Sequence, residues 1–83
     1  MTNKNECRSK LNDVEEKLNL SPACYKVNGV YKIHWGYADE ALSGSLWDAT
    51  PEEEAEYNRR KDACQIIDFL IQVRNALLSE LAK

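Results

Sequence analysis

The sequence has few cysteines, few glycines and no long hydrophobic run, and each scarcity excludes a class of protein. No stretch approaches the roughly 20 apolar residues of a membrane-spanning helix, so we expect no membrane segment. The 3 cysteines are an odd number and too sparse for a disulfide scaffold, which indicates reduced thiols and a cytoplasmic location. The 3 glycines, Gly29, Gly36 and Gly44, are scattered, so the chain has no glycine-rich phosphate-binding loop.

Patterns for catalysis and metal binding are also missing. The single histidine, His34, has no CxxC or HxxxH spacing around it, so we predict no zinc site. Glu52, Glu53 and Glu56 have the EExxE spacing of helical nucleotide pyrophosphatases, but no ExxD pair follows to complete an oxygen shell. We therefore expect a protein that is not an enzyme and holds no metal or cofactor. A metal-dependent helical hydrolase is kept as an alternative.

Basic residues are absent from the middle of the chain. The net charge is −3, residues 35–62 carry eight acids against three bases, and no Lys or Arg occurs between Lys32 and Arg59. Such a segment disfavours contact with nucleic-acid phosphates and suits a basic protein, including one that itself handles nucleic acid. We predict a partner-binding surface formed by the seven acids of this gap, Asp39, Glu40, Asp48, Glu52, Glu53, Glu54 and Glu56. The simpler interpretation is that the acids near residue 52 complement a helix dipole and stay solvated.

One basic cluster supports a different hypothesis. Residues 59–61, the run RRK, have the charge to contact a nucleic-acid backbone, with Lys26 and Lys32 extending the patch. Acids flank the run, and the chain has no helix-turn-helix or zinc-finger pattern, which argues against direct nucleic-acid binding. A small nucleic-acid-binding regulator is therefore the second function that the sequence leaves open.

Residues 4–20 have the periodicity of an amphipathic helix. Cys7, Leu11, Val14 and Leu18 repeat at spacings of four, three and four, which places them on one stripe. The helix should end before Pro22, because proline disfavours helical geometry in the preceding residue and offers no amide hydrogen.

Residues 23–35 are typical of a β-hairpin centred on Asn28-Gly29. Asn-Gly is a strong turn signal, because both central residues of a type I′ turn need positive φ. A two-residue loop pairs Val27 with Val30, whereas a three-residue loop shifts the register and turns one strand over. The sequence leaves both registers open.

Residues 36–49 carry turn signals and little periodicity. Residues 38–42 are compatible with a helical turn. Leu46-Trp47 is interpreted either as an apolar plug or as a short third strand on the hairpin, since a two-stranded hairpin alone is marginal.

The C-terminal helix has a clear start signal. Thr50 is a capping residue, Pro51 suits the first helical position, and Glu53 is placed as the capping-box partner. No breaker follows, so we predict a helix over 51–82, about 45 Å long at 1.5 Å per residue. This exceeds the roughly 25 Å diameter of a compact domain of this size, so part of the helix should project or pack against a second copy.

Residues 63–81 offer more apolar surface than one small chain covers. The first of two apolar stripes consists of Ala63, Ile66, Leu70, Val73 and Leu77, widened by Phe69 and Ala76. Since a helix that is apolar over most of its circumference is buried on several sides, we expect the N-terminal helix and the hairpin to cover one stripe. A second copy should cover the other stripe, giving a homodimer through Cys64, Ile67, Ile71, Arg74, Leu78 and Leu81. The Arg74 guanidinium then either contacts an acid of another chain or reaches water while its stem packs.

The sequence as a whole predicts a single small domain, residues 1–83, of the α+β class. It should contain an N-terminal helix, a β-hairpin and a long C-terminal helix. We expect a non-enzymatic protein-interaction module, a small regulator or inhibitor that binds a macromolecular partner through its acidic surface.

Overall fold

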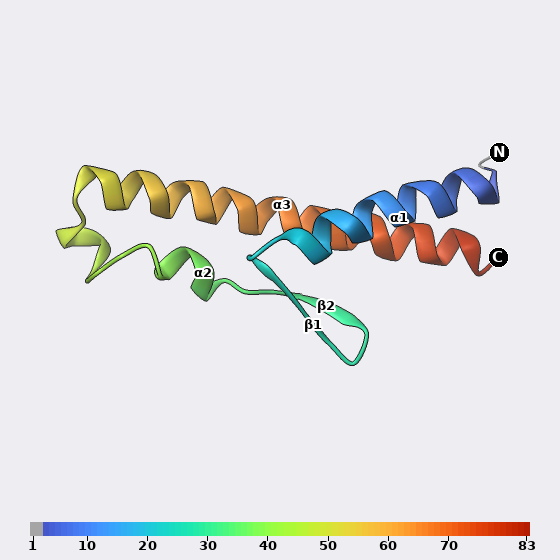
Figure 1. Cartoon of the computed structure of the whole chain (residues 1–83), viewed down its shortest axis with the longest axis horizontal. Helices are drawn as coiled ribbons and strands as arrows, with labels where there is room; N and C mark the ends of the chain where they lie inside the picture. Colours follow the sequence, from blue (N-terminus) through green and yellow to red (C-terminus); the bar gives the residue numbers. More distant parts are fainter. Residues whose placement is uncertain (1–2) are drawn as a thin grey trace.

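The computed structural model describes residues 3–83, so the first two residues of the predicted domain lie outside it. The elements in chain order are α1 (Lys4–Leu20), β1 (Cys24–Val27), β2 (Val30–Ile33), α2 (Gly36–Asp39), the 3₁₀ helix η1 (Leu46–Asp48) and α3 (Pro51–Leu81). Figure 1 shows α1 lying along the C-terminal half of α3, while the segment with α2 runs back along its N-terminal half. The predicted α+β class is confirmed.

The N-terminal helix begins and ends where its local signals place it. The side chain of Asn3 caps α1 by accepting a hydrogen bond from the Asn5 amide at 2.8 Å. After Leu20 the backbone becomes extended, and the Ser21 hydroxyl oxygen accepts from the Ala23 amide at 3.2 Å. The prediction of a helix over 4–20 is confirmed.

The hairpin has the two-residue loop. The strands β1 and β2 are antiparallel, and Val27 pairs with Val30. Asn28 and Gly29 have φ values of 51° and 80°, which are the positive values that a type I′ turn requires. The strands end at Ile33, two residues before the predicted end of the hairpin.

The segment after the hairpin differs from the prediction. Among residues 3–83 the sheet has two strands, and Leu46-Trp47 lies in η1 rather than in a third strand. Both interpretations of Leu46-Trp47 are wrong, because Leu46 is 52% exposed and Trp47 is 96% exposed. The local reason is a closed turn, in which the Asp48 amide donates to the Ser45 carbonyl at 3.1 Å and the Ser45 hydroxyl donates to the Asp48 carboxylate at 2.9 Å.

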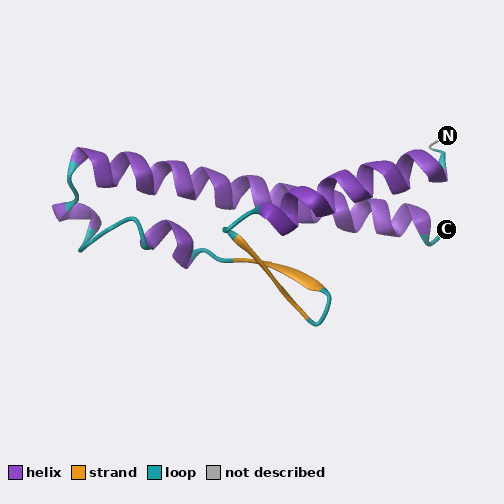
Figure 2. Cartoon of the chain, in the orientation of Figure 1, coloured by secondary structure: helices purple, strands orange, loops and turns teal. Residues whose placement is uncertain are grey.

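The long helix α3 makes the molecule elongated (Figure 2). The Thr50 hydroxyl caps it by accepting from the Glu53 amide at 3.2 Å, and Pro51 takes the first position. The helix ends at Leu81, one residue before the predicted end, and the molecule measures 51 × 25 × 17 Å. Its radius of gyration is 16.0 Å, whereas a compact chain of this length has about 12 Å.

The hydrophobic core lies between α1, the hairpin and the middle of α3. One cluster of buried residues joins these elements: Val14, Leu18, Ala23, Tyr31, Cys64 and Ile67. Tyr31 connects all three, because its hydroxyl donates to the Asn19 side chain at 2.7 Å and the Arg74 guanidinium lies 4.9 Å from its ring centre. Within residues 3–83, no helix has the length and apolar content needed to cross a membrane.

Candidate functional site

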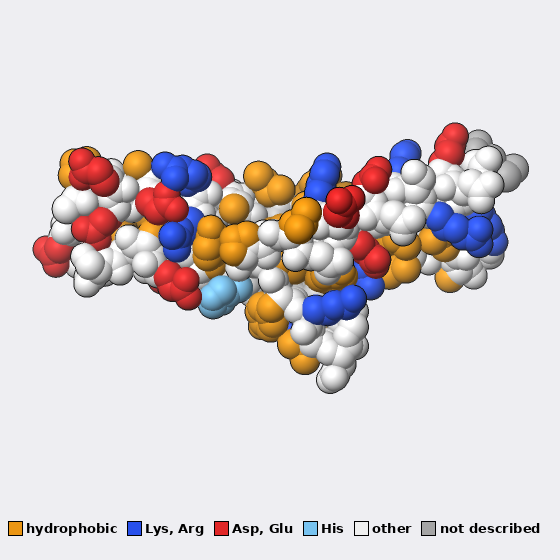
Figure 3. All heavy atoms as spheres, in the orientation of Figure 1, with side chains coloured by type: hydrophobic (Ala, Val, Ile, Leu, Met, Phe, Trp, Pro, Cys, Tyr) orange, Lys and Arg blue, Asp and Glu red, His pale blue; other side chains and the backbone are white. Residues whose placement is uncertain are grey.

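The acidic residues gather at one end of the molecule. Asp39 and Glu40 lie at the end of α2, Asp48 lies in η1, and the four remaining predicted acids lie in the first turns of α3. Figure 3 shows this end, on the left, with most of the red side chains of that face. The fold therefore brings together acids that are up to 17 positions apart in the sequence, from residue 39 to residue 56.

One of the acids, Glu53, holds the preceding loop against α3. Its carboxylate accepts from the Ser43 amide at 2.8 Å and from the Ser43 hydroxyl at 2.9 Å. These two hydrogen bonds lower the pKa of Glu53, and those of Thr50 act in the same direction. Glu53 is thus a positioning residue within the chain as well as a member of the acidic set.

Glu56 is neutralised by its own helix. Its carboxylate pairs with Arg59 one turn ahead and accepts from the Nε of Arg60 at 2.8 Å. The hydrogen bond from Arg60, aided by the nearby charge of Arg59, lowers the pKa of Glu56. Arg60 also donates to the Tyr37 carbonyl at 3.2 Å and lies 4.6 Å from the centre of the Tyr37 ring. Two of the three bases of the predicted nucleic-acid patch are therefore engaged within the chain.

The other acids face water. Glu40 lies 3.3 Å from the Nε2 of His34, on an exposed part of the surface. Asp39, Glu52 and Glu54 are exposed and make no ion pair with any of residues 3–83. This end of the molecule consequently presents negative charge that the chain itself does not balance.

An exposed tryptophan accompanies these acids. Trp47 has 96% of its surface in water and lies in η1, next to Asp48 and close in sequence to the start of α3. The sequence alone does not reveal Trp47 as a surface residue, because an apolar pair after a hairpin is typical of a core position. The signal that would have located it is the Ser45–Asp48 spacing, which closes the turn and leaves Trp47 outside.

The predicted dimer stripe lies mostly against the protein itself. Cys64 is 0% exposed and Ile67 is 4% exposed, because α1 and the hairpin pack over them. Arg74 donates to the Glu15 carboxylate of the same chain at 3.0 Å, so neither interpretation of this arginine describes its contact. Ile71 and Leu81 are half-buried, and Leu78 is 38% exposed. The assignment of this stripe to a second copy is therefore corrected at Cys64, Ile67 and Arg74.

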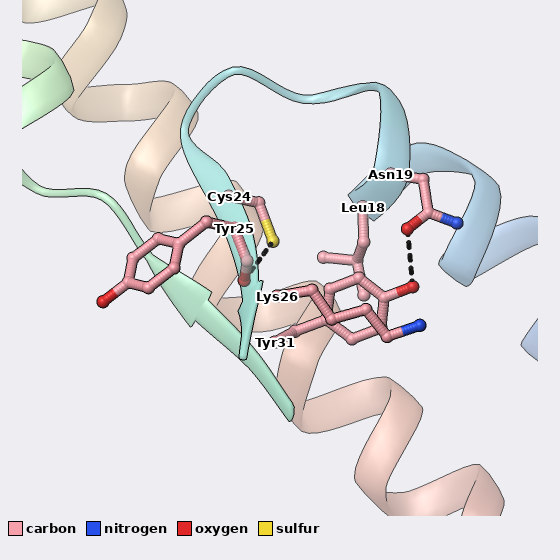
Figure 4. Close-up of a pocket in the computed structure, with 6 residues that line it drawn as sticks. All are labelled: Leu18, Asn19, Cys24, Tyr25, Lys26 and Tyr31. Carbon is pink, nitrogen blue, oxygen red and sulfur yellow. Dashed lines mark hydrogen bonds between the residues drawn. The ribbon is translucent and has the colours of Figure 1, made fainter. Parts of the chain in front are cut away.

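Two hollows lie on or beside α1. A pocket of about 120 Å³ between α1 and the hairpin is lined by Leu18, Asn19, Cys24, Tyr25, Lys26 and Tyr31 (Figure 4). Figure 4 shows the Cys24 sulfur directed toward the Tyr25 carbonyl, at 3.9 Å, and burial raises the pKa of this thiol. A second hollow of about 350 Å³ is lined by Asp13, Glu16, Lys17 and Leu20, all of α1. The pocket between α1 and the hairpin is smaller than the 300–1,000 Å³ of typical ligand pockets. The hollow on α1 is lined by residues of that helix alone.

No group of three or more His, Cys, Asp or Glu side chains is placed to hold a metal ion in the part of the chain that the structure describes. The chain matches no protein-family model, no curated protein and no solved structure. What the protein does is therefore inferred from its own residues.

Proposed function

We propose that the protein is a non-enzymatic interaction module, a small regulator or inhibitor, whose acidic end binds a basic protein. The observation that carries the proposal is Trp47, an almost fully exposed indole at an end rich in unbalanced acids. Tryptophan is enriched among the residues that dominate binding energy, because it buries a large rigid surface at little entropic cost. In the free chain Trp47 buries almost none of that surface, so its indole would gain contacts only when a partner binds.

The charges around Trp47 define the chemistry of the partner. No Lys or Arg occurs between Lys32 and Arg59, and Glu56 pairs with both Arg59 and Arg60. The field of this end therefore attracts positive surfaces, which raises association rates and makes them sensitive to salt. A partner of matching chemistry has a Lys- or Arg-rich surface around an apolar pocket. Proteins that grip nucleic acid have basic surfaces of this kind.

The three free cysteines support a reducing compartment such as the cytoplasm as the place of action. Cys7 and Cys64 are buried and Cys24 is half-buried. None of the three forms a disulfide with another cysteine of the chain, which is what reduced thiols in such a compartment would do.

The test distinguishes the contribution of the Trp47 indole to partner binding from the contribution of the acidic side chains. The protein, as bait in its host lysate, should retain a partner that is lost with Trp47→Ala and weakened with the double variant Glu52→Gln/Glu54→Gln. Glu53 and Glu56 are left unchanged, because they hold Ser43 and Arg60. With the purified partner, Trp47→Ala should raise the Kd by about 10- to 30-fold, as expected for a central aromatic contact.

Matched controls exist for both changes. Trp35, the other tryptophan, is 51% exposed and lies outside the acidic set, so Trp35→Ala should bind normally. Glu6→Gln/Glu16→Gln removes the same charge from exposed positions of α1. If the Trp47 and Glu52/Glu54 variants bind at physiological salt as tightly as these controls, the proposed function is wrong.

A further inference from the structure

The long helix has a second exposed surface, on the side that faces away from the core. We define the outer face of α3 as Ile66, Phe69, Val73 and Ala76, which follow one another at spacings of three, four and three. At 100° per residue, Ile66 lies about 200° around the helix from the buried Cys64. The spacing is that of the contact positions of two helices packed side by side.

The outer face of α3 is apolar, and three of its four residues, Ile66, Phe69 and Ala76, are exposed, while Val73 is half-buried and packs against the core. Ile66 is 58% exposed and Phe69 is 64% exposed, because α1 and the hairpin pack on the other side of the helix. By helical position, no charged residue falls on this face between Asp62 and Glu80. These two acids are 18 residues apart, which corresponds to about 27 Å of helix. The face is thus an uncharged strip bounded by charge at each end.

The total exposed surface is larger than one chain of this mass should have. The protein exposes 5958 Å², whereas a compact monomer of 9.5 kDa exposes about 5,000 Å². The excess of about 900 Å² is spread over the whole elongated molecule, and a second copy packed on the outer face of α3 would cover part of it. The single chain also has a thin core, since only eight of the described residues are buried.

We infer that the outer face of α3 packs against the same face of a second copy, forming a two-fold homodimer. A second copy suits this face because the strip carries no charge that would require an opposite charge on the partner. The strongly negative end lies in the other half of the helix, so its repulsion acts outside the contact. This surface is opposite the stripe that the sequence analysis assigned to the dimer, and it does not depend on the acidic end.

The first experiment measures the mass of the purified protein in solution. Light scattering at micromolar concentration should give twice 9.5 kDa for the wild type. Ile66→Glu and Phe69→Glu should each raise the dimer dissociation constant on the order of 100-fold or more, because each change occurs twice in a two-fold interface. Both sites are exposed in the single chain, so the far-ultraviolet circular dichroism of the monomer should be retained.

Two matched variants decide which surface is used. Leu20→Glu introduces the same charge at a site that is 77% exposed on α1, and it should remain dimeric. Leu78→Glu places the charge on the originally predicted stripe. A wild type that stays monomeric, a dimer that both outer-face variants retain, or a dimer that only Leu78→Glu dissociates would each overturn the inference.

A second measurement needs no substitution. Phe69 is the single phenylalanine of the chain, so isotope-labelled phenylalanine reports on one ring. In a mixture of labelled and unlabelled chains, the Phe69 ring should show intermolecular nuclear Overhauser contacts to Ile66 or Val73 of the other copy. If the mixture shows no such contacts at concentrations where the mass is that of a dimer, the outer face of α3 is not the interface.

Discussion

The contact of Arg74 with Glu15 and Tyr31 should be one of the larger single contributions to stability. Arg74 lies on α3, yet it donates to the Glu15 carboxylate of α1 at 3.0 Å and lies 4.9 Å from the centre of the Tyr31 ring in β2. Its side chain is 16% exposed and that of Glu15 is 33% exposed. Replacing Arg74 with alanine removes contacts to two other elements at once.

The expected cost follows from these contacts. A hydrogen bond to a charged group contributes about 1.5–3 kcal/mol, and a cation–π contact about 0.5–1 kcal/mol. Since the pair remains partly accessible to water, the ionic contribution takes the low end of its range. Arg74→Ala should therefore lower the free energy of unfolding by about 2 kcal/mol. A domain of this length has a total of roughly 4–12 kcal/mol, so the loss is a substantial fraction.

Urea denaturation followed by circular dichroism, at one fixed protein concentration, measures this change. A double-mutant cycle with Glu15→Gln should give a coupling of about 1 kcal/mol, and Arg74→Lys should recover part of the stability, since it keeps the charge but not the planar group. Arg59→Ala is the matched control, because Arg59 is exposed and makes only a surface pair. If Arg74→Ala costs no more than Arg59→Ala, the assigned contact does not stabilise the fold.

Two further predictions concern titration and thiol reactivity. The pKa of Glu53 is lowered in the folded chain, so its contribution is complete above the ordinary value of 4.5 and is lost as the pH falls through the lower folded value. The contact of Ser43 with α3 should loosen there, as followed by the chemical shift of the Ser43 amide, and Glu53→Gln should abolish this pH dependence. At neutral pH a thiol reagent should modify the half-buried Cys24 slowly, since burial raises its pKa, and should modify Cys64 and Cys7 only in denaturant. Peptide mapping that finds Cys64 labelled in the native protein would contradict its burial.

Features encoded within a few residues could be predicted from the sequence. Pro22 limits α1, Asn28-Gly29 sets the hairpin loop, and Thr50-Pro51 starts α3, each through backbone geometry that depends on neighbouring residues alone. The acidic segment could also be predicted from the sequence, because it depends only on which residues follow one another along the chain.

Only the tertiary structure decided which surfaces are covered. Helical periodicity shows which residues share a stripe, and both stripes of α3 were apolar, so nothing local distinguished buried Ile67 from exposed Ile66. The choice depends on where α1 and the hairpin pack, and that is set by contacts between residues far apart in the chain, such as Arg74 with Glu15. The apolar character of Trp47 likewise did not predict its exposure. Its side chain is exposed because no other element of the fold packs against it.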